Sequence, residues 1–189
     1  MLYLASQSPR RRQLLEQLGL RFAVLDVDVP EVHRENEPPE DYVSRVAREK
    51  AGAGLLQVAG VAGAIVLGAD TEVVLDDEVF GKPADAAAAA AMLRRLQGRR
   101  HRVISTVWLL SAGREEHATS LSEVSFAPMD EAAIAAYVAS GEPYGRAGAY
   151  AIQGLAAAHI DHLSGSFSGV MGLPLHETAQ LLRHFGHPV

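Results

Sequence analysis

The fold can be inferred outward from one stretch near the N-terminus, Leu2-Tyr3-Leu4-Ala5-Ser6-Gln7-Ser8-Pro9-Arg10-Arg11-Arg12-Gln13-Leu14-Leu15. We interpret it as a short strand that turns directly into a helix. The apolar residues 2–5 suit a strand, Ser8 suits a helix N-cap, and Pro9 suits the first helical position. The stretch therefore predicts that strands and helices follow one another closely in this chain.

Three arginines occupy the first turn of that predicted helix. Arg10, Arg11 and Arg12 lie where the helix macrodipole is positive, a place that favours acidic side chains. Three cations beside unpaired backbone N–H groups are explained if the missing partner is an anion such as phosphate. A solvated basic cluster that pairs with nearby acids explains the same residues equally well. Charge alone leaves both interpretations open.

Composition limits the classes of protein to which the chain can belong. Its 189 residues fit one domain, residues 1–189, and 48% of them are hydrophobic, as in ordinary globular proteins. A formal net charge of −6 argues against a nucleic-acid partner bound through bulk electrostatics. The absence of cysteine excludes disulfides and cysteine-based zinc sites. No signal sequence or long apolar run is found, so we expect a cytoplasmic protein without a membrane partner.

Apolar patterns predict strands and helices that alternate along the whole chain. The predicted strands cover residues 2–5, 21–27, 64–75, 79–80, 102–110 and 116–126, with strand-like or hairpin-like segments at 141–154 and 160–170. The predicted helices begin at 9, within 38–41, at about 84 and at 131, and residues 171–174 open a last one. Some crossovers are long enough for parallel pairing, so we expect an α/β architecture with a mixed β-sheet.

One aspartate interrupts a strand that otherwise reads as buried. Residues 64–69 form a continuous apolar run, which continues through Asp70 and Thr71 into residues 72–75. A carboxylate joined to a buried strand is costly unless it is paired or binds a metal. A turn after Gly68 is the structural alternative, and we favour a carboxylate delivered to a functional site.

Two lysines are further candidates for binding anions. Lys50 falls on the apolar stripe of the predicted helix 39–56, where a lysine more often extends to the surface than into a cleft. Lys82 lies between Gly81 and Pro83 just before a helix start, where it is either a loop lysine or a phosphate ligand. Cations together with Asp70 and Glu31 are the minimum set for a magnesium–polyphosphate site.

Other catalytic classes lack their motifs. There is no Walker-type phosphate loop and no kinase loop. The segment Gly165–Gly169 has Phe167 where a nucleophilic serine would stand, and the eight histidines show no metal-ligand spacing.

The chain resembles the Maf family of nucleotide pyrophosphatases, also called septum-formation inhibitor proteins. The matching motifs occur in the family's order over nearly the whole chain: Ala5-Ser6-Gln7-Ser8-Pro9-Arg10-Arg11, Arg48-Glu49-Lys50-Ala51, Gly68-Ala69-Asp70-Thr71, Lys82-Pro83, Ala147-Gly148-Ala149-Tyr150-Ala151-Ile152-Gln153-Gly154 and Gly172-Leu173-Pro174. The resemblance implies an elongated mixed sheet with flanking helices and two lobes around a central cleft, as in inosine triphosphatases. It also implies a homodimer.

The resemblance implies that a nucleoside triphosphate is hydrolysed between its α and β phosphates with the help of Mg²⁺ or Mn²⁺. Asp70 matches the acceptor of the proton from water, and Glu31 and Asp70 match the metal site. The phosphate-binding positions are Ser8, Arg10, Arg11, Lys50 and Lys82. The motif around Gln153 is similar to the branch that acts on dTTP and UTP, in which Arg10, Thr71 and Gln153 match the specificity positions. A glutamine amide offers the donor and acceptor that a uracil or thymine edge requires.

Two other functions compete with this interpretation. One is a nucleotide-binding regulator of cell division without significant catalysis, which would not require an acid at Asp70. The other is hydrolysis of purine or damaged-purine triphosphates on a related fold.

Overall fold

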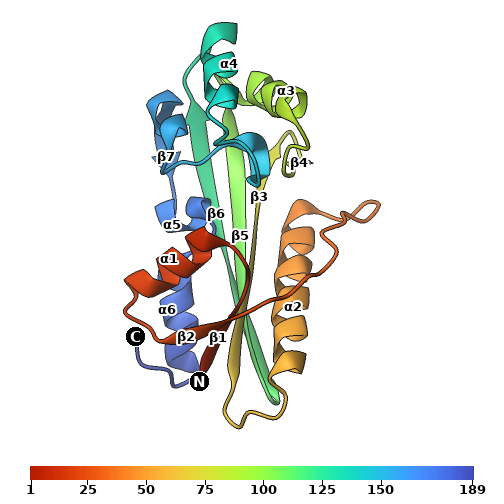
Figure 1. The fold of residues 1–189 in the computed structure, drawn as a ribbon, viewed down its shortest axis with the longest axis vertical. Coiled ribbons are helices and arrows are strands. Elements are labelled where there is room, and N and C mark those ends of the chain that lie inside the picture. The colour runs from red at the N-terminus through yellow and green to blue at the C-terminus, as the bar shows by residue number, and fades with distance from the viewer.

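A seven-stranded mixed sheet forms the long axis of the molecule in the computed structural model, which describes residues 1–189 (Figure 1). The strand order is β2-β1-β3-β5-β6-β7, and β4 pairs with β3. The pairs of β1 with β2 and with β3 are parallel, and all other pairs are antiparallel. The strands are β1 (Leu2–Ala5), β2 (Phe22–Leu25), β3 (Ile65–Leu75), β4 (Glu78–Phe80), β5 (Arg100–Ser111), β6 (Arg114–Phe126) and β7 (Ile160–Ser164). The predicted mixed α/β architecture is confirmed.

Helices flank the sheet on both sides, with α2 on one side and α1 and α6 on the other (Figure 1). The helices are α1 (Pro9–Gln17), α2 (Pro39–Gln57), α3 (Ala86–Leu96), α4 (Glu131–Ala139), α5 (Phe167–Met171) and α6 (Leu175–His184), with 3₁₀ turns η1 (Ala147–Ala149) and η2 (Leu155–His159). None of these helices combines the length and apolar character needed to cross a membrane. The helix starts predicted at 9, within 38–41 and at 131 are confirmed, and α6 begins directly after the predicted opening segment 171–174.

Two apolar cores explain why β3 and β5 are hydrophobic on both faces. Val73 and Val103 belong to the main core, whereas their neighbours Val74 and Ile104 pack against α2 in a separate cluster. Successive side chains of a strand point to opposite faces of a sheet. The continuous apolar runs of the sequence therefore correspond to strands covered by helices on both sides.

Strand β3 joins the two lobes of the molecule, one around β1 and β2 and the other around β4, α3 and α4 (Figure 1). This arrangement positions the site. Its first half pairs with β1 through residues 65–67, and its second half pairs with β4 through residues 73–75. Between these pairings, residues 68–72 have no strand on that edge, although they pair with β5 on the other. The edge of the sheet thus opens at the stretch that contains Asp70.

Helix α2 crosses this open stretch at very short range. A Cβ atom built on Gly68 would lie 2.4 Å from the backbone oxygen of Ala47 and 2.5 Å from the backbone nitrogen of Ala51. Only glycine allows the two backbones to approach this closely. The close approach places Lys50, one residue before Ala51, over the middle of β3.

Two predictions of extended structure were wrong. Residues 141–154 form turns and the 3₁₀ turn η1, because Gly148 and Ala149 have left-handed backbones with φ of 66° and 61°. Within 160–170, only residues 160–164 form a strand. The chain then enters α5, where Ser166 caps the helix by accepting a hydrogen bond from the backbone nitrogen of Gly169 at 3.0 Å.

Candidate active site

A cavity of about 470 Å³ lies between the two lobes, where the edge of the sheet is open. It is bounded by the end of β1, the start of α1, the middle of β3, the loop before η1 and the end of α5. All nine site residues that the family resemblance implies line it: Ser8, Arg10, Arg11, Glu31, Lys50, Asp70, Thr71, Lys82 and Gln153. The structure therefore brings the candidates together, and the role of each stays a prediction.

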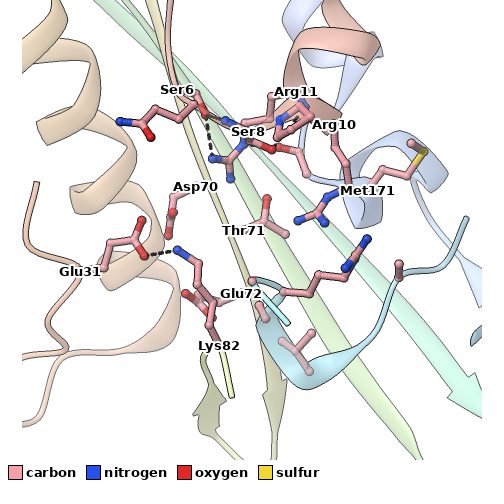
Figure 2. A pocket seen from close by; sticks show the side chains of 18 of the residues that line it. Ser6, Ser8, Arg10, Arg11, Glu31, Asp70, Thr71, Glu72, Lys82 and Met171 are labelled. Atoms are coloured by element: carbon pink, nitrogen blue, oxygen red, sulfur yellow. Dashed lines mark hydrogen bonds and ion pairs between the residues drawn. The ribbon is translucent and has the colours of Figure 1, made fainter. Parts of the chain in front are cut away.

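Lysines and carboxylates form one end of the cavity. The Nζ atom of Lys50 donates to Oδ1 of Asp70 at 2.7 Å and lies 2.6 Å from Oε1 of Glu31. The second oxygen of Glu31 accepts from Nζ of Lys82 at 2.5 Å, an ion pair drawn in Figure 2. Lys50 is 8% exposed and Asp70 is 4% exposed. The expectation that Lys50 more often extends to the surface was wrong, because α2 passes too close to β3 for its side chain to leave.

The two lysines stabilise the charge of Glu31. Burial alone would raise the pKa of this carboxyl, but the charges and hydrogen bonds of Lys50 and Lys82 outweigh burial and lower the pKa to about 2. Glu31 is therefore ionised at any pH near neutrality. Asp70 uses only Oδ1 for its ion pair, and its buried Oδ2 has no hydrogen-bond partner.

Glu72 is a third carboxyl at this end. It follows Asp70 by two residues, so both side chains point to the same face of β3. Glu72 is 5% exposed and its Oε2 has no partner. Burial, together with the charges of Asp70 and Glu31, raises the pKa of Glu72 well above its usual value.

Guanidinium groups form the other end of the cavity (Figure 2). Nε of Arg11 donates to the backbone oxygen of Gly172 at 2.8 Å, and the guanidinium of Arg10 has neither an ion pair nor a hydrogen bond. Burial, then the charges of Arg146 and Arg11, lower the pKa of Arg10 to about 10. Arg12 instead pairs with Glu16 on the surface at 3.1 Å. Arg12 thus forms a solvated ion pair with Glu16, whereas Arg10 and Arg11 face the cavity.

The helix that carries these arginines begins as predicted. Oγ of Ser8 caps α1 and lies 3.5 Å from the backbone nitrogen of Arg11. Ser6, which precedes the helix, is buried and accepts from the backbone nitrogen of Ser8 at 3.2 Å. Its Oγ also lies 3.5 Å from Nη1 of Arg11. The turn between β1 and α1 is therefore held by two serine hydroxyls that line the cavity.

The two remaining candidates differ in how they are held. Oγ1 of Thr71 lies 2.6 Å from Oγ of Ser105 on the neighbouring strand β5. Gln153 is exposed, and its side-chain amide makes no hydrogen bond within the protein. The turn after it is anchored by Glu142, whose carboxylate accepts from the backbone nitrogens of Leu155 at 3.0 Å and Ala156 at 3.3 Å. The Gln153 amide is thus free to bind a ligand.

Comparison with known proteins identifies the family. The family model described as Maf-like protein matches residues 1–185. The chain belongs to the Maf family. A Maf protein of Xanthomonas euvesicatoria, named dTTP/UTP pyrophosphatase, is 58% identical over 98% of this chain and 99% of its own. Another from Xylella fastidiosa, named nucleoside triphosphate pyrophosphatase, is 58% identical over 98% of both chains.

Solved structures give a weaker likeness to this Maf protein. A nucleoside triphosphatase or dITP/XTP pyrophosphatase from Mycobacterium abscessus shares 19% of residues with it, over 68% of this chain and 73% of the other. Its TM-score of 0.43 is too low to support an argument about fold or function.

The residues of this Maf protein fit a divalent metal that is shared with phosphate. No group of three or more metal-ligating side chains is gathered at one point, so the protein offers no complete cage. Magnesium, however, needs only one or two carboxylates when phosphate oxygens and water complete its shell. The carboxylates of Asp70 and Glu31, which both contact Nζ of Lys50, could supply these ligands.

Sequence reasoning missed three residues of the cavity. Ser6 lies in a family motif whose assigned residues come after it, and Glu72 could have been found from its two-residue spacing after Asp70. The position of Arg146 could not be predicted, because nothing in the local sequence shows that the loop after α4 folds back over the cavity.

Proposed function

We propose that this Maf protein hydrolyses nucleoside triphosphates, principally dTTP and UTP, to the nucleoside monophosphate and pyrophosphate. The names of its 58% identical relatives support this proposal. The observation that carries it is the buried Lys50–Asp70 pair, which faces unpaired guanidinium groups across the cavity. Such a cavity supplies both an acid–base group and cations for a polyphosphate.

Asp70 is the group we propose to take a proton from the attacking water. Its Oδ1 is fixed by Lys50 at 2.7 Å, so the carboxylate has one held oxygen and one free oxygen. The free Oδ2 would accept the proton while the ion pair keeps the carboxylate oriented. Water attacks the α phosphorus, the bond to the bridging oxygen breaks, and pyrophosphate leaves with the electron pair.

We propose that the polyphosphate is held by Ser8, Arg10, Arg11, Lys50 and Lys82. A phosphate oxygen would replace Glu31 as the partner of a lysine, so the ion pairs seen here would rearrange rather than form anew. These cations would offset the negative charge that develops on the leaving pyrophosphate. Because they are already in place, little reorganisation is needed as the bond breaks.

A divalent metal completes the proposal. Glu31 and Asp70 would hold Mg²⁺ or Mn²⁺ together with phosphate oxygens, and the metal would polarise the phosphoryl group. For base choice, the free amide of Gln153 would pair with the uracil or thymine edge. Thr71 and Arg10 would bound that pocket.

A regulator that only binds nucleotide is not favoured. Such a protein has no need of a buried carboxylate oxygen without a partner, a feature that costs stability. Further proposals are a single domain over residues 1–189 and a cytoplasmic location, which rest on the sequence, and a homodimer, which rests on the family resemblance.

The test is a panel of nucleotides with the pure protein, Mg²⁺ and a pyrophosphate assay. We expect the highest kcat/KM with dTTP and UTP. Absence of pyrophosphate from every triphosphate would refute the enzyme proposal. Release mainly from a purine nucleotide would refute only the assignment to pyrimidines.

A further inference from the structure

Twelve of the 17 lysines and arginines of this acidic protein have a carboxylate partner. The lysines and arginines without one are Arg10, Arg11, Arg21, Arg146 and Arg183. Arg21 and Arg183 are exposed, where water solvates the charge. The other three all line the cavity. The chain thus leaves its partly buried unpaired cations in one place.

Arg146 belongs to the loop after α4, in the lobe opposite α1. Its Nη1 donates to two backbone oxygens of its own loop, those of Glu142 and of Tyr144, the latter at 3.2 Å. Its Nε is buried without any acceptor. These contacts fix one side of the guanidinium and leave the edge formed by Nε and Nη2 unused. That edge is the one with which arginine binds carboxylate or phosphate through two parallel hydrogen bonds.

Arg10 and Arg146 are close enough to repel each other. Among the charged neighbours, Arg146 has the largest effect in lowering the pKa of Arg10. Two half-buried cations that repel each other, without an anion in contact, are an unfavourable arrangement that an anion between them would relieve. The two arise from opposite lobes of the molecule, so that anion would contact both.

We propose that Arg146 is a further ligand of the substrate polyphosphate, which it reaches from the loop after α4 while Arg10 reaches it from α1. This inference rests on the proposed function, and it adds a residue that sequence reasoning did not assign. The loop hydrogen bonds would hold the guanidinium in place before substrate arrives, which lowers the entropy cost of binding.

The test is calorimetric binding of α,β-methylene-UTP and of UMP, both with Mg²⁺, to Arg146→Met, Arg146→Lys and the native protein. Arg146→Met should weaken binding of the triphosphate analogue by roughly 10- to 100-fold, the usual cost of a charge-assisted hydrogen bond. Binding of UMP should weaken by less than about threefold. Arg146→Lys should recover part of the loss, because it restores the charge without the two-pronged edge. The control is Arg183→Met, which removes an equally unpaired arginine outside the cavity.

The outcomes separate this inference from a purely structural role. If Arg146 only holds its loop, Arg146→Met lowers Tm and weakens UMP and the analogue equally, which would overturn the proposal. Unchanged binding of the analogue would overturn it as well. Should Arg146→Met fail to fold, the ratio of the two affinities in Arg146→Lys decides. A native protein that binds the analogue but releases no pyrophosphate from any nucleotide would refute the proposed function and leave the inference about Arg146 standing.

Discussion

The buried ion pair of Lys50 and Asp70 makes the two carboxylate oxygens of Asp70 inequivalent, because Lys50 contacts only one of them. Taking both charges out of water is expensive, and the attraction between them offsets that cost only at short range. The 2.7 Å contact meets this condition for Oδ1, and Glu31 adds a second negative charge beside the lysine. The remaining oxygen of Asp70 is left unpartnered in a cavity that is otherwise rich in donors. That asymmetry is what a general base requires.

Asp70→Asn should therefore abolish turnover while the protein stays folded. We expect kcat to fall by at least roughly 10²-fold, the usual contribution of a general base. Lys50 keeps Glu31 as a partner, so Tm should change little. The matched control is Asp28→Asn, which removes the same charge from an exposed residue at the cavity rim. Steady-state kinetics with UTP provide the measurement, and a kcat within threefold of the native value would remove Asp70 from the role of base.

Glu72 should make the protein less stable as the pH rises. Its folded pKa lies well above its unfolded value, so above about pH 4.3 the folded state binds more protons than the unfolded state. The free energy of unfolding therefore falls with increasing pH through this window, until the folded pKa is passed. Glu72→Gln removes the titrating group. We expect it to raise the free energy of unfolding at pH 8 by clearly more than at pH 5, as measured by urea denaturation.

The control for Glu72 is Glu35→Gln, an equal charge change at an exposed residue without hydrogen bonds from its side chain. It should have a small effect that is similar at both pH values. An equal effect of Glu72→Gln at pH 5 and pH 8 would contradict the assignment of a raised pKa.

At the scale of elements, α2 and β3 are the pair on which the site depends. The contact at Gly68 sets the distance between the helix that carries Lys50 and the strand that carries Asp70. Both residues are contributed by regular structure rather than by loops, which holds their side chains precisely. Small changes in the spacing of the two elements should therefore affect stability and chemistry together.

Gly68→Ala tests that coupling. The new Cβ would meet backbone atoms of Ala47 and Ala51, which cannot rotate away, so α2 must shift. We expect a loss of about 1–3 kcal/mol in the free energy of unfolding, typical of overpacking, and a fall in kcat. The control is Gly52→Ala in the same helix, where nothing lies within 4 Å of the added Cβ. It should stabilise by about 0.5–1 kcal/mol, because alanine is the better helix former. If Gly68→Ala behaves like Gly52→Ala, the close contact does not hold.

Elements that depend on local patterns were predictable from sequence, and those that depend on tertiary contacts were not. Helices α2 and α4 follow from their apolar spacing and start signals. Residues 141–154 failed because small apolar residues fit a strand and a tight turn equally well, and only the left-handed backbone of Gly148 and Ala149 decides. The direction of the Lys50 side chain could not be predicted either. It depends on a close approach to Gly68, a residue distant in sequence.

The same distinction applies to the site. The nine site residues predicted from the family motifs line one cavity, and their roles stay predictions. The motifs assign no role to Glu72 or Arg146. These two residues become candidates only because the fold places them in the cavity beside the other site residues. The electrostatic state of Glu72, in particular, depends on Glu31 and Asp70 and cannot be inferred from its own strand.

At the scale of the whole molecule, a ligand in the cavity would contact both lobes. Binding to the folded state alone stabilises a protein by about 2.7 kcal/mol at a ligand concentration 100 times Kd. For a chain of this size that corresponds to a rise in Tm of roughly 5–10 °C. We expect α,β-methylene-UTP with Mg²⁺ to give such a shift in a thermal melt. Mg²⁺ alone should give almost none, because Lys50 and Lys82 already occupy the carboxylates. A shift with Mg²⁺ alone that equals the shift with both would contradict a metal site completed by phosphate.

The contact of Arg11 with Gly172 has a consequence for how the protein is made. It joins residues 161 positions apart, and residues 170–172 complete the wall of the cavity. On the ribosome the chain emerges N-terminus first, so α1 must wait for residues 170–172 before that wall exists. A nascent or prematurely terminated chain would expose its arginines and apolar strands without a finished cavity. Synthesis must therefore pass residue 172 before the cavity is complete.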